Sequence, residues 1–134
     1  MAKIPIDDIG YLDSEDLLDL PDDEFLRIMR MAAQNRYDTE KYRNFEDKWK
    51  KYSGISSVSS KVILDFGCGA GIEALEFARE NKVIIADINP LNLQVANRLL
   101  GLHGFQPQEI VQINHSEPFF ELKTKEIDMF YANG

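Results

Sequence analysis

Residues 62–73 of the chain read VILDFGCGAGIE, and the rest of the sequence is organised around this stretch. Its first three residues, Val62 to Leu64, form a short uncharged run that is typical of a strand buried on both faces of a parallel sheet. Three glycines at alternating positions follow. Because glycine lacks a Cβ atom, such a loop can adopt positive φ angles and let a ligand lie against main-chain N–H groups. The residues after the loop favour a helix, so the stretch predicts a strand, a glycine loop and a helix N-terminus.

A second apolar run, residues 83–86, ends at Asp87 and predicts the next parallel strand. The glycine spacing separates two ligand classes. A dinucleotide fingerprint is G-x-G-x-x-G, but here Ile72 stands where that fingerprint requires its last glycine. Asp65, directly before the loop, would repel a pyrophosphate and suits a ligand that carries an ammonium group. The pattern therefore disfavours a nicotinamide-dependent oxidoreductase.

The segment from Asp65 to Gly71 resembles the first motif of the class I S-adenosylmethionine-dependent methyltransferases, which is acidic-x-Gly-x-Gly-x-Gly. Asp87 resembles the acidic residue that ends their second strand. The likeness covers about residues 60–134 and corresponds to the N-terminal part of that family only. It implies a Rossmann-like fold, S-adenosylmethionine as cofactor and S-adenosylhomocysteine as product.

Composition and charge narrow the function further. The chain has 134 residues, a single cysteine, 44% hydrophobic residues and a net charge of −8. Residues 1–24 hold nine acidic residues against Lys3, and the remaining chain is charge-balanced. This balance argues against a nucleic-acid partner held mainly by phosphate contacts and favours a small molecule. The sequence has no long apolar run and no signal-peptide pattern, so we expect no membrane span and a cytoplasmic protein.

We expect two parts, an acidic arm with N-terminal helices over 1–58 and an incomplete Rossmann-like core over 59–134. Ser14 and Asp22 are the expected caps of the first two helices, and Asn89 that of a later helix with proline at its first position. The aromatic stripe Tyr42, Phe45, Trp49 and Tyr52 has helical spacing; it either packs in the core or covers the cofactor. The expected elements are helices over 15–20, 23–34 and 39–52, strand 61–66, helix 72–80, strand 82–86, helix 91–100, and strands 109–113 and 126–131.

These elements predict an α/β, doubly wound and mostly parallel sheet of strand order 3-2-1-4, truncated after strand 4. Right-handed crossovers place strands 2 and 3 on one side of strand 1 and strand 4 on the other. A ligand should bind at the carboxyl ends of the strands, where the order reverses at strand 1. Strand 4 would leave an apolar edge exposed, so we expect either a fragment of a longer protein, which we favour, or an edge covered by another chain through self-association or by residues 1–58.

The resemblance assigns a role to each site residue. Asp87 would accept hydrogen bonds from the ribose diol, and Ile88 would lie against the adenine ring. The glycines at 67, 69 and 71 would approach the methionine part of the cofactor. Asp65 would either attract its ammonium group or brace the loop.

Further positions complete the candidate cofactor site. Cys68 belongs to the cofactor loop, and we do not expect a nucleophile there because no histidine lies near it. Asn114 would bond the adenine amino group, and Asn133 would lie near the reaction centre. His103 and His115 have no metal-ligand spacing around them, so no metal site is expected. The pattern identifies no catalytic residue.

Two functions remain open. The first is methyl transfer to an acceptor that the sequence does not identify, with a small molecule favoured, or cofactor binding alone if the chain is a fragment. The second is a non-catalytic binding or assembly module that keeps the methyltransferase fold and uses its acidic arm and aromatic helix to hold a partner. The intact glycines and acidic residues favour the first.

Overall fold

A computed structural model of the chain describes residues 12–38, 58–114, 116 and 122–132. The chain divides into two compact units, residues 1–57 and 58–134, each of which is described by itself. The third expected helix, over 39–52, lies outside the described residues together with its aromatic stripe.

The first unit begins with helix α1 (Ser14–Leu18), and its cap differs from the expected one. Asp13, not Ser14, is the N-cap residue: its Oδ1 accepts from the amide of Asp16 at 2.9 Å. The Asp16 carboxylate accepts in turn from the amide of Asp13 at 3.2 Å, which completes a capping box. This reciprocal pair uses two carboxylates, so it satisfies two helix-end amides where a single Ser14 hydroxyl would satisfy one.

Helix α2 (Asp22–Asp38) continues beyond the expected end at residue 34. The polar segment 35–38 contains neither glycine nor proline, and polarity alone does not end a helix. Phe25, Ile28 and Met29, which recur at the spacing of one helix face, are buried. The helical periodicity of this segment is therefore confirmed, but its end was wrong, and Asp22, the expected cap, is the first residue of the helix.

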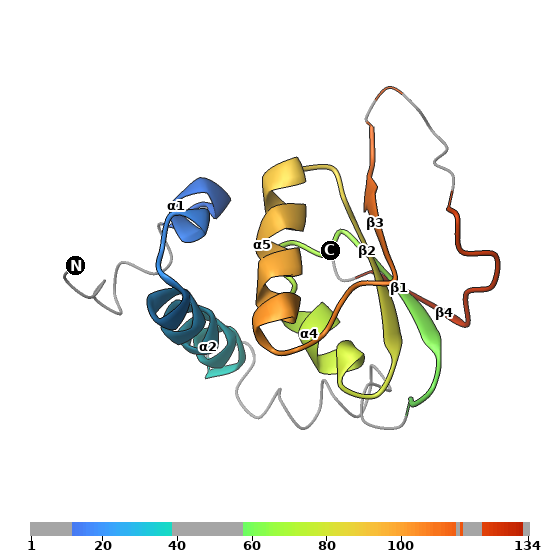
Figure 1. Ribbon diagram of the computed structural model, residues 1–134, viewed down its shortest axis with the longest axis horizontal. Helices are drawn as coiled ribbons and strands as arrows, with labels where there is room; N and C mark the ends of the chain where they lie inside the picture. Colours follow the sequence, from blue (N-terminus) through green and yellow to red (C-terminus); the bar gives the residue numbers. More distant parts are fainter. Residues whose placement is uncertain (1–11, 39–57, 115, 117–121, 133–134) are drawn as a thin grey trace. The chain divides into compact units, whose positions relative to one another are not determined.

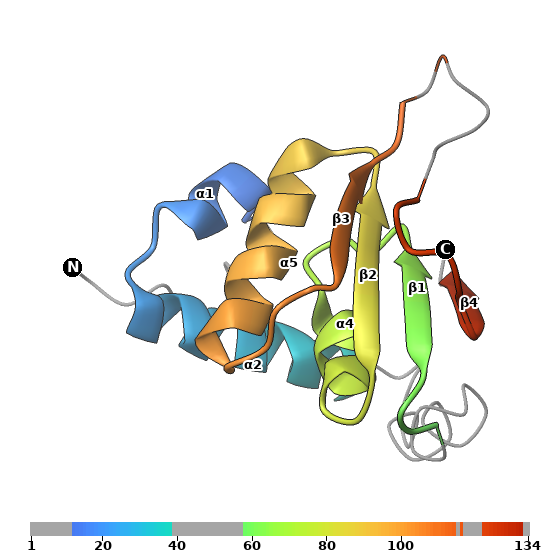
Figure 2. The same cartoon turned by 45° about the vertical axis from the view of Figure 1, so that its right-hand side comes forward.

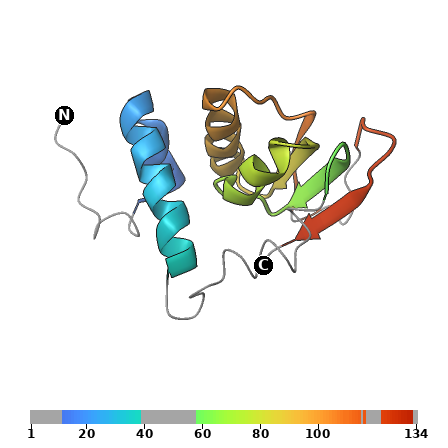
Figure 3. The ribbon, with the colours of Figure 1, turned by 90° about the horizontal axis from the view of Figure 1, so that it is seen from below.

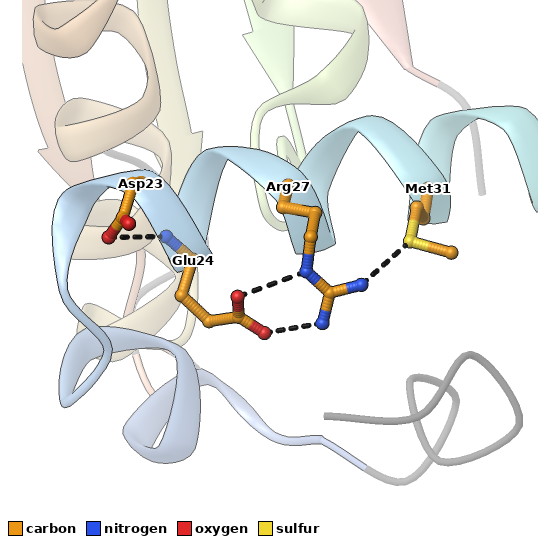
Figure 4. A network of polar contacts seen from close by, with 4 residues as sticks. All are labelled: Asp23, Glu24, Arg27 and Met31. Carbon is orange, nitrogen blue, oxygen red and sulfur yellow. Dashed lines mark hydrogen bonds and ion pairs between the residues drawn. The ribbon is translucent and has the colours of Figure 1, made fainter. Parts of the chain in front are cut away.

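An ion pair occupies the surface of the same helix (Figure 4). Arg27 Nε lies 3.0 Å from Glu24 Oε2, and a second guanidinium nitrogen contacts the other carboxylate oxygen. Arg27 Nη1 also lies 3.2 Å from the sulfur of Met31. The hydrogen bond to Glu24 raises the pKa of Arg27.

The second unit holds a four-stranded parallel sheet of order β3-β2-β1-β4, as predicted (Figure 2). The central strand β1 pairs with β2 on one side and with β4 on the other, so the strand order reverses there. The strands are β1 (Val62–Phe66), β2 (Lys82–Asp87), β3 (Glu109–Gln112) and β4 (Met129–Ala132).

Helices α4 (Ile72–Ala78) and α5 (Pro90–Leu102) connect β1 to β2 and β2 to β3 and lie on one face of the sheet (Figures 1 and 3). Two successive right-handed crossovers in one direction require this arrangement. The side chains of Ile63, Val83 and Ile85 are at most 2% exposed beneath the two helices. Phe77 of α4 meets the ring of Tyr131 edge-on, with centroids 5.0 Å apart.

The opposite face of the sheet has a core of its own, made of Leu64, Ile84, Ala86 and Val111. Leu122 and Ile127, which precede β4, pack against this core. We call residues 122–128 the β4 approach. The expected fourth strand began at residue 126, but β4 begins at Met129, because Asp128 ends the approach. Its amide donates to the Val62 carbonyl at 2.9 Å, and its Oδ2 accepts from the Val62 amide at 2.8 Å.

Candidate functional site

The glycine loop between β1 and α4 is held tightly at its base. The amides of Gly67 and Cys68 both donate to the carbonyl of Ala86 in β2, at 2.8 and 3.0 Å. All three glycines have positive φ, namely 72° at Gly67, 55° at Gly69 and 87° at Gly71. The third is needed for packing as well, because a Cβ atom there would lie 2.8 Å from the Cβ of Ala96 in α5. The sequence prediction of a glycine-dependent turn is thereby confirmed.

The first two glycines of the loop face open space. A Cβ atom added to Gly67 or Gly69 would meet no atom within 4 Å. These two positions therefore do not need glycine for packing against the protein. They keep the backbone in the left-handed region and leave its surface bare, which is what a closely approaching ligand requires.

Asp87, the last residue of β2, lies beside this loop with its side chain 8% exposed. Its Oδ2 accepts from the amide of Gly69 at 2.9 Å, and its Oδ1 accepts from the amide of Asn89 at 2.8 Å. The side-chain nitrogen of Asn92 lies 3.4 Å from the same Oδ1. One carboxylate therefore joins the glycine loop to the start of α5.

The segment after Asp87 has the predicted cap. Asn89 Oδ1 accepts from the amide of Leu91 at 2.9 Å, and Pro90 occupies the first position of α5. Ile88, between the strand and the cap, leaves 41% of its surface exposed. An exposed branched side chain next to the carboxylate is available to a planar ring.

Three buried side chains lie around the loop. Asp65 in β1 is 2% exposed and Glu73, in the first turn of α4, is 5% exposed. Cys68 is 5% exposed, and its Sγ lies 3.5 Å from the carbonyl of Gly69. Burial, reinforced by the negative charges of Asp65 and Asp87, raises the pKa of the Cys68 thiol. A raised pKa makes a thiol a poorer nucleophile at neutral pH.

Asn114 follows β3 and is exposed. Its Oδ1 accepts from the amide of Ser116 at 3.1 Å and from the Ser116 hydroxyl at 2.9 Å. The side chain thus forms a local turn and keeps its amide nitrogen for other partners. The described residues do not include Asn133 or His115. His103 is the C-cap residue of α5, and its Nδ1 lies 2.9 Å from the Leu99 carbonyl.

The described residues contain neither a candidate metal site nor a candidate membrane-spanning helix. Within them, no group of three or more histidine, cysteine, aspartate or glutamate side chains is placed to hold a metal ion. The helices that the structure describes are also too short or too polar to cross a bilayer.

The sequence interpretation missed two residues beside the site. Glu73 lies in the segment after the loop that favours a helix, and its side chain is buried in the first turn of α4. Asn92 was not singled out, yet its amide reaches Asp87. The only signal in the sequence is helical spacing from the Asn89 cap, which places Asn92 on the turn that faces the end of β2.

The comparisons agree with this geometry. No protein-family model matches the chain. It superposes on a S-adenosylmethionine-dependent methyltransferase from Clostridium acetobutylicum with a TM-score of 0.53 and 15% identity, covering 75% of this chain and 42% of that one. A protein from Listeria monocytogenes, assigned to the class I S-adenosylmethionine-dependent methyltransferases, gives a TM-score of 0.52 and 12% identity over 92% of this chain and 42% of that one. The chain therefore has the class I S-adenosylmethionine-dependent methyltransferase fold.

A match in sequence points the same way over a shorter length. The chain is 45% identical over 47 residues to the ribosomal RNA small subunit methyltransferase C of Aeromonas hydrophila, which covers 33% of this chain. It spans only 14% of that relative and less than half of either solved structure.

Proposed function

We propose that this chain binds S-adenosylmethionine at the carboxyl ends of β1 and β2 and is the cofactor-binding part of a methyltransferase. The observation that carries the proposal is the pairing of a bare glycine loop with a buried carboxylate. Gly67 and Gly69 leave open space above the loop, and Asp87 lies beside it at the end of the neighbouring strand. This is the switch point of the sheet, where α/β proteins bind their ligands.

The residues present fit that cofactor. A ribose diol offers two O–H donors, and Asp87 offers charged acceptors, which form stronger hydrogen bonds than neutral ones. Ile88 offers an exposed apolar surface to adenine. Because the oxygen of Asn114 already accepts twice from Ser116, its side-chain nitrogen would donate to a ring nitrogen of adenine in place of the expected bond to the adenine amino group. On the methionine side, the backbone of Gly67 to Gly71 would receive the amino acid part, and Asp65 supplies the negative charge that attracts its ammonium group. Cys68 takes part through its backbone alone, and Asn133 would lie near the transferable methyl group.

The proposed methyl transfer requires the protein mainly to position the reacting groups and to exclude water. When bound, S-adenosylmethionine would supply a methyl group to which an acceptor bonds in line, with the thioether S-adenosylhomocysteine as the leaving group. The residues of this chain position the cofactor and exclude water around it. No acid or base of this chain is required for a good nucleophile, and none is assigned.

Calorimetry tests the proposal directly. We expect heat on titrating the chain with S-adenosylmethionine or S-adenosylhomocysteine, and no heat with NADH. Absence of heat with both sulfur compounds would overturn the proposal. Heat with NADH alone would favour an oxidoreductase instead.

The acceptor is the second part of the proposal. The chain after residue 24 has equal numbers of acidic and basic residues, and this charge balance favours a small molecule as the methyl acceptor. RNA is the second candidate, because the local relative in Aeromonas hydrophila is a ribosomal RNA methyltransferase. Transfer of a labelled methyl group from the cofactor to total RNA or to a low-molecular-weight cell extract would separate the two. We place the reaction in the cytoplasm, where a thiol such as Cys68 stays reduced.

A binding module without catalysis is the alternative. It predicts cofactor heat but no methyl transfer to either acceptor pool, or no heat at all if the pocket serves only as a scaffold. The buried carboxylate and the bare glycine loop weigh against a pure scaffold, because neither is needed to fill a core.

We further propose that a second copy of the chain can pair with β4. Within the described residues β4 pairs with β1 on one side only, and Phe130, stacked on Phe66, leaves 60% of its surface exposed. Sedimentation should then show a dimer that Phe130→Lys converts to monomer. A monomeric parent chain would overturn this part.

A further inference from the structure

The acceptor positions of Asp87 are almost fully used by the protein itself. An ionised carboxylate offers about two lone pairs on each oxygen. Oδ2 accepts from Gly69 alone, whereas Oδ1 accepts from Asn89 and from the side chain of Asn92. Among the described donors, therefore, one position on Oδ2 remains open and both positions on Oδ1 are taken.

A ribose diol needs two acceptors, so its second hydroxyl has to share Oδ1 with a protein donor. The two contacts on Oδ1 differ in strength. The amide of Asn89 is a backbone group fixed by the helix start, at 2.8 Å, but the side-chain nitrogen of Asn92 is 3.4 Å away. The longer contact is the weaker of the two, and its donor sits on a rotatable side chain. The hydroxyl would therefore take the place of the Asn92 side chain, and not of the Asn89 amide, as a donor to Oδ1.

We propose that Asn92 is a cofactor-contacting residue that reads the ribose diol together with Asp87. A hydroxyl donates one hydrogen bond and also accepts. Because Asn92 Nδ2 and Asp87 Oδ1 are 3.4 Å apart, one hydroxyl oxygen can lie within hydrogen-bond distance of both. It then donates to the carboxylate and accepts from the amide. Asn92 is half-buried in the first turn of α5, and its amide already lies beside Asp87 before the cofactor arrives.

This inference rests on the proposed function, and a pair of ligands tests it separately. The ligands are S-adenosylhomocysteine and its 2′,3′-dideoxy form, titrated calorimetrically into the parent chain, Asn92→Ala and Asn97→Ala. Asn97 is the matched control, because it is an exposed asparagine on the same helix, away from Asp87. Alanine favours a helix more than asparagine does, so neither substitution weakens α5 itself.

We expect Asn92→Ala to bind S-adenosylhomocysteine about 3- to 10-fold more weakly, the effect of one neutral hydrogen bond. Its affinity for the dideoxy ligand should equal that of the parent chain, and Asn97→Ala should match the parent with both ligands. If Asn92→Ala does not fold, Asn92→Leu, an apolar side chain of similar size, replaces it.

Two results would overturn the inference. One is an unchanged affinity of the Asn92 variant for S-adenosylhomocysteine. The other is an equal loss with both ligands, which would assign Asn92 to the structure of the site and not to the diol. No heat from the parent chain with S-adenosylhomocysteine would instead overturn the proposed function, and the inference with it.

Discussion

The amide of Gly69 donates to the carboxylate of Asp87 across 2.9 Å, although the two residues are eighteen positions apart in the sequence. This bond ties the middle of the glycine loop to the end of β2. The other oxygen of the same carboxylate holds the start of α5 through Asn89. Asp87 therefore shapes the site before any cofactor arrives, and its removal should affect both binding and local structure.

Substitution of Asp87 by alanine should weaken S-adenosylmethionine binding by about 1.5–3 kcal/mol, the range for a lost hydrogen bond to a charged group. Calorimetry measures this directly. Glu80→Ala is the matched control, because Glu80 is an exposed acidic residue after α4 and before the other end of β2. A Kd for Asp87→Ala equal to that of the parent chain would remove Asp87 from the cofactor site.

Asp87→Asn tests the negative charge of Asp87 separately from the shape of its side chain. It keeps one acceptor oxygen and the size of the side chain, so the loop should be better preserved than in Asp87→Ala. We expect both the binding loss and the fall in thermal stability to lie between those of the parent chain and the alanine variant, because the new side-chain nitrogen faces one of the two backbone amides that donate to the carboxylate. A binding loss as large as that of Asp87→Ala would mean that the charge alone matters.

Alanine at position 71 should impair folding. The new Cβ atom would lie 2.8 Å from the Cβ of Ala96 and 2.9 Å from its Cα, at a φ of 87° that side chains rarely adopt. Strain and overlap together should cost about 2–5 kcal/mol in the free energy of unfolding, measured in urea. Ala96→Gly in the same chain should restore part of the loss, since it removes one of the two close contacts. No restoration would indicate that backbone strain dominates.

Alanine at position 69 should impair cofactor binding more than folding. No atom lies within 4 Å of its new Cβ, so only the positive φ is penalised, at about 1–2 kcal/mol. That Cβ would point into the space proposed for the cofactor, and we expect S-adenosylmethionine binding to fall at least about tenfold, the equivalent of about 1.4 kcal/mol. Parental affinity in a folded Gly69→Ala chain would contradict the proposed position of the cofactor.

Much of the core was predictable because each signal was local. The glycine loop and the Asn89 cap follow from short patterns whose physical meaning does not depend on the rest of the chain, and the strand order follows from the succession of these elements and the handedness of their crossovers. The ends of elements were less predictable. Helix α2 runs four residues further than polarity suggested, and β4 starts three residues later because Asp128 bonds to Val62. That contact joins residues 66 positions apart, and no local pattern contains it.

The residues of the candidate site fall into the same two groups, those that a local pattern predicts and those that depend on the tertiary structure. Its glycines and Asp87 were recognisable from spacing, because backbone conformation and strand ends leave a trace in the sequence. The burial of Glu73 and the reach of Asn92 depend on how α4 and α5 pack on the sheet. Side-chain relations of this kind arise from tertiary structure, so they were missed.

Cys68 should be chemically quiet in the folded chain. Its side chain is 5% exposed, and burial together with the charge of Asp65 raises its pKa. Because the thiolate is the reactive form, we expect iodoacetamide at pH 8 to label the native chain more than roughly 100-fold more slowly than the chain unfolded in urea. Mass spectrometry follows the labelling. Equal rates in the two states would contradict the buried, protonated thiol.

Glu109, the first residue of β3, binds the β4 approach through its carboxylate. Its Oε2 accepts from the amide of Lys123 at 2.8 Å, and its Oε1 accepts from the amide and hydroxyl of Thr124 at 2.8 and 2.7 Å. The hydrogen bond from the Lys123 amide, followed by those from Thr124, holds the pKa of Glu109 below its ordinary value. The carboxylate thus secures the segment whose Leu122 and Ile127 cover one face of the sheet.

A lowered folded-state pKa fixes the direction of the pH dependence. The unfolded chain binds the proton more readily, so the stabilisation by Glu109 is fully present above the ordinary glutamate pKa of about 4.3. It is lost as the pH falls through the lower folded-state value. Glu109→Gln should therefore reduce the free energy of unfolding at pH 7 by about 1–2 kcal/mol, and this difference from the parent chain should shrink below about pH 4.3. Urea unfolding followed by circular dichroism at several pH values measures it, with Glu126→Gln, an exposed glutamate of the same segment, as control. A difference that stays constant down to pH 2, or one that grows in acid, would show that the Glu109 charge does not hold the β4 approach.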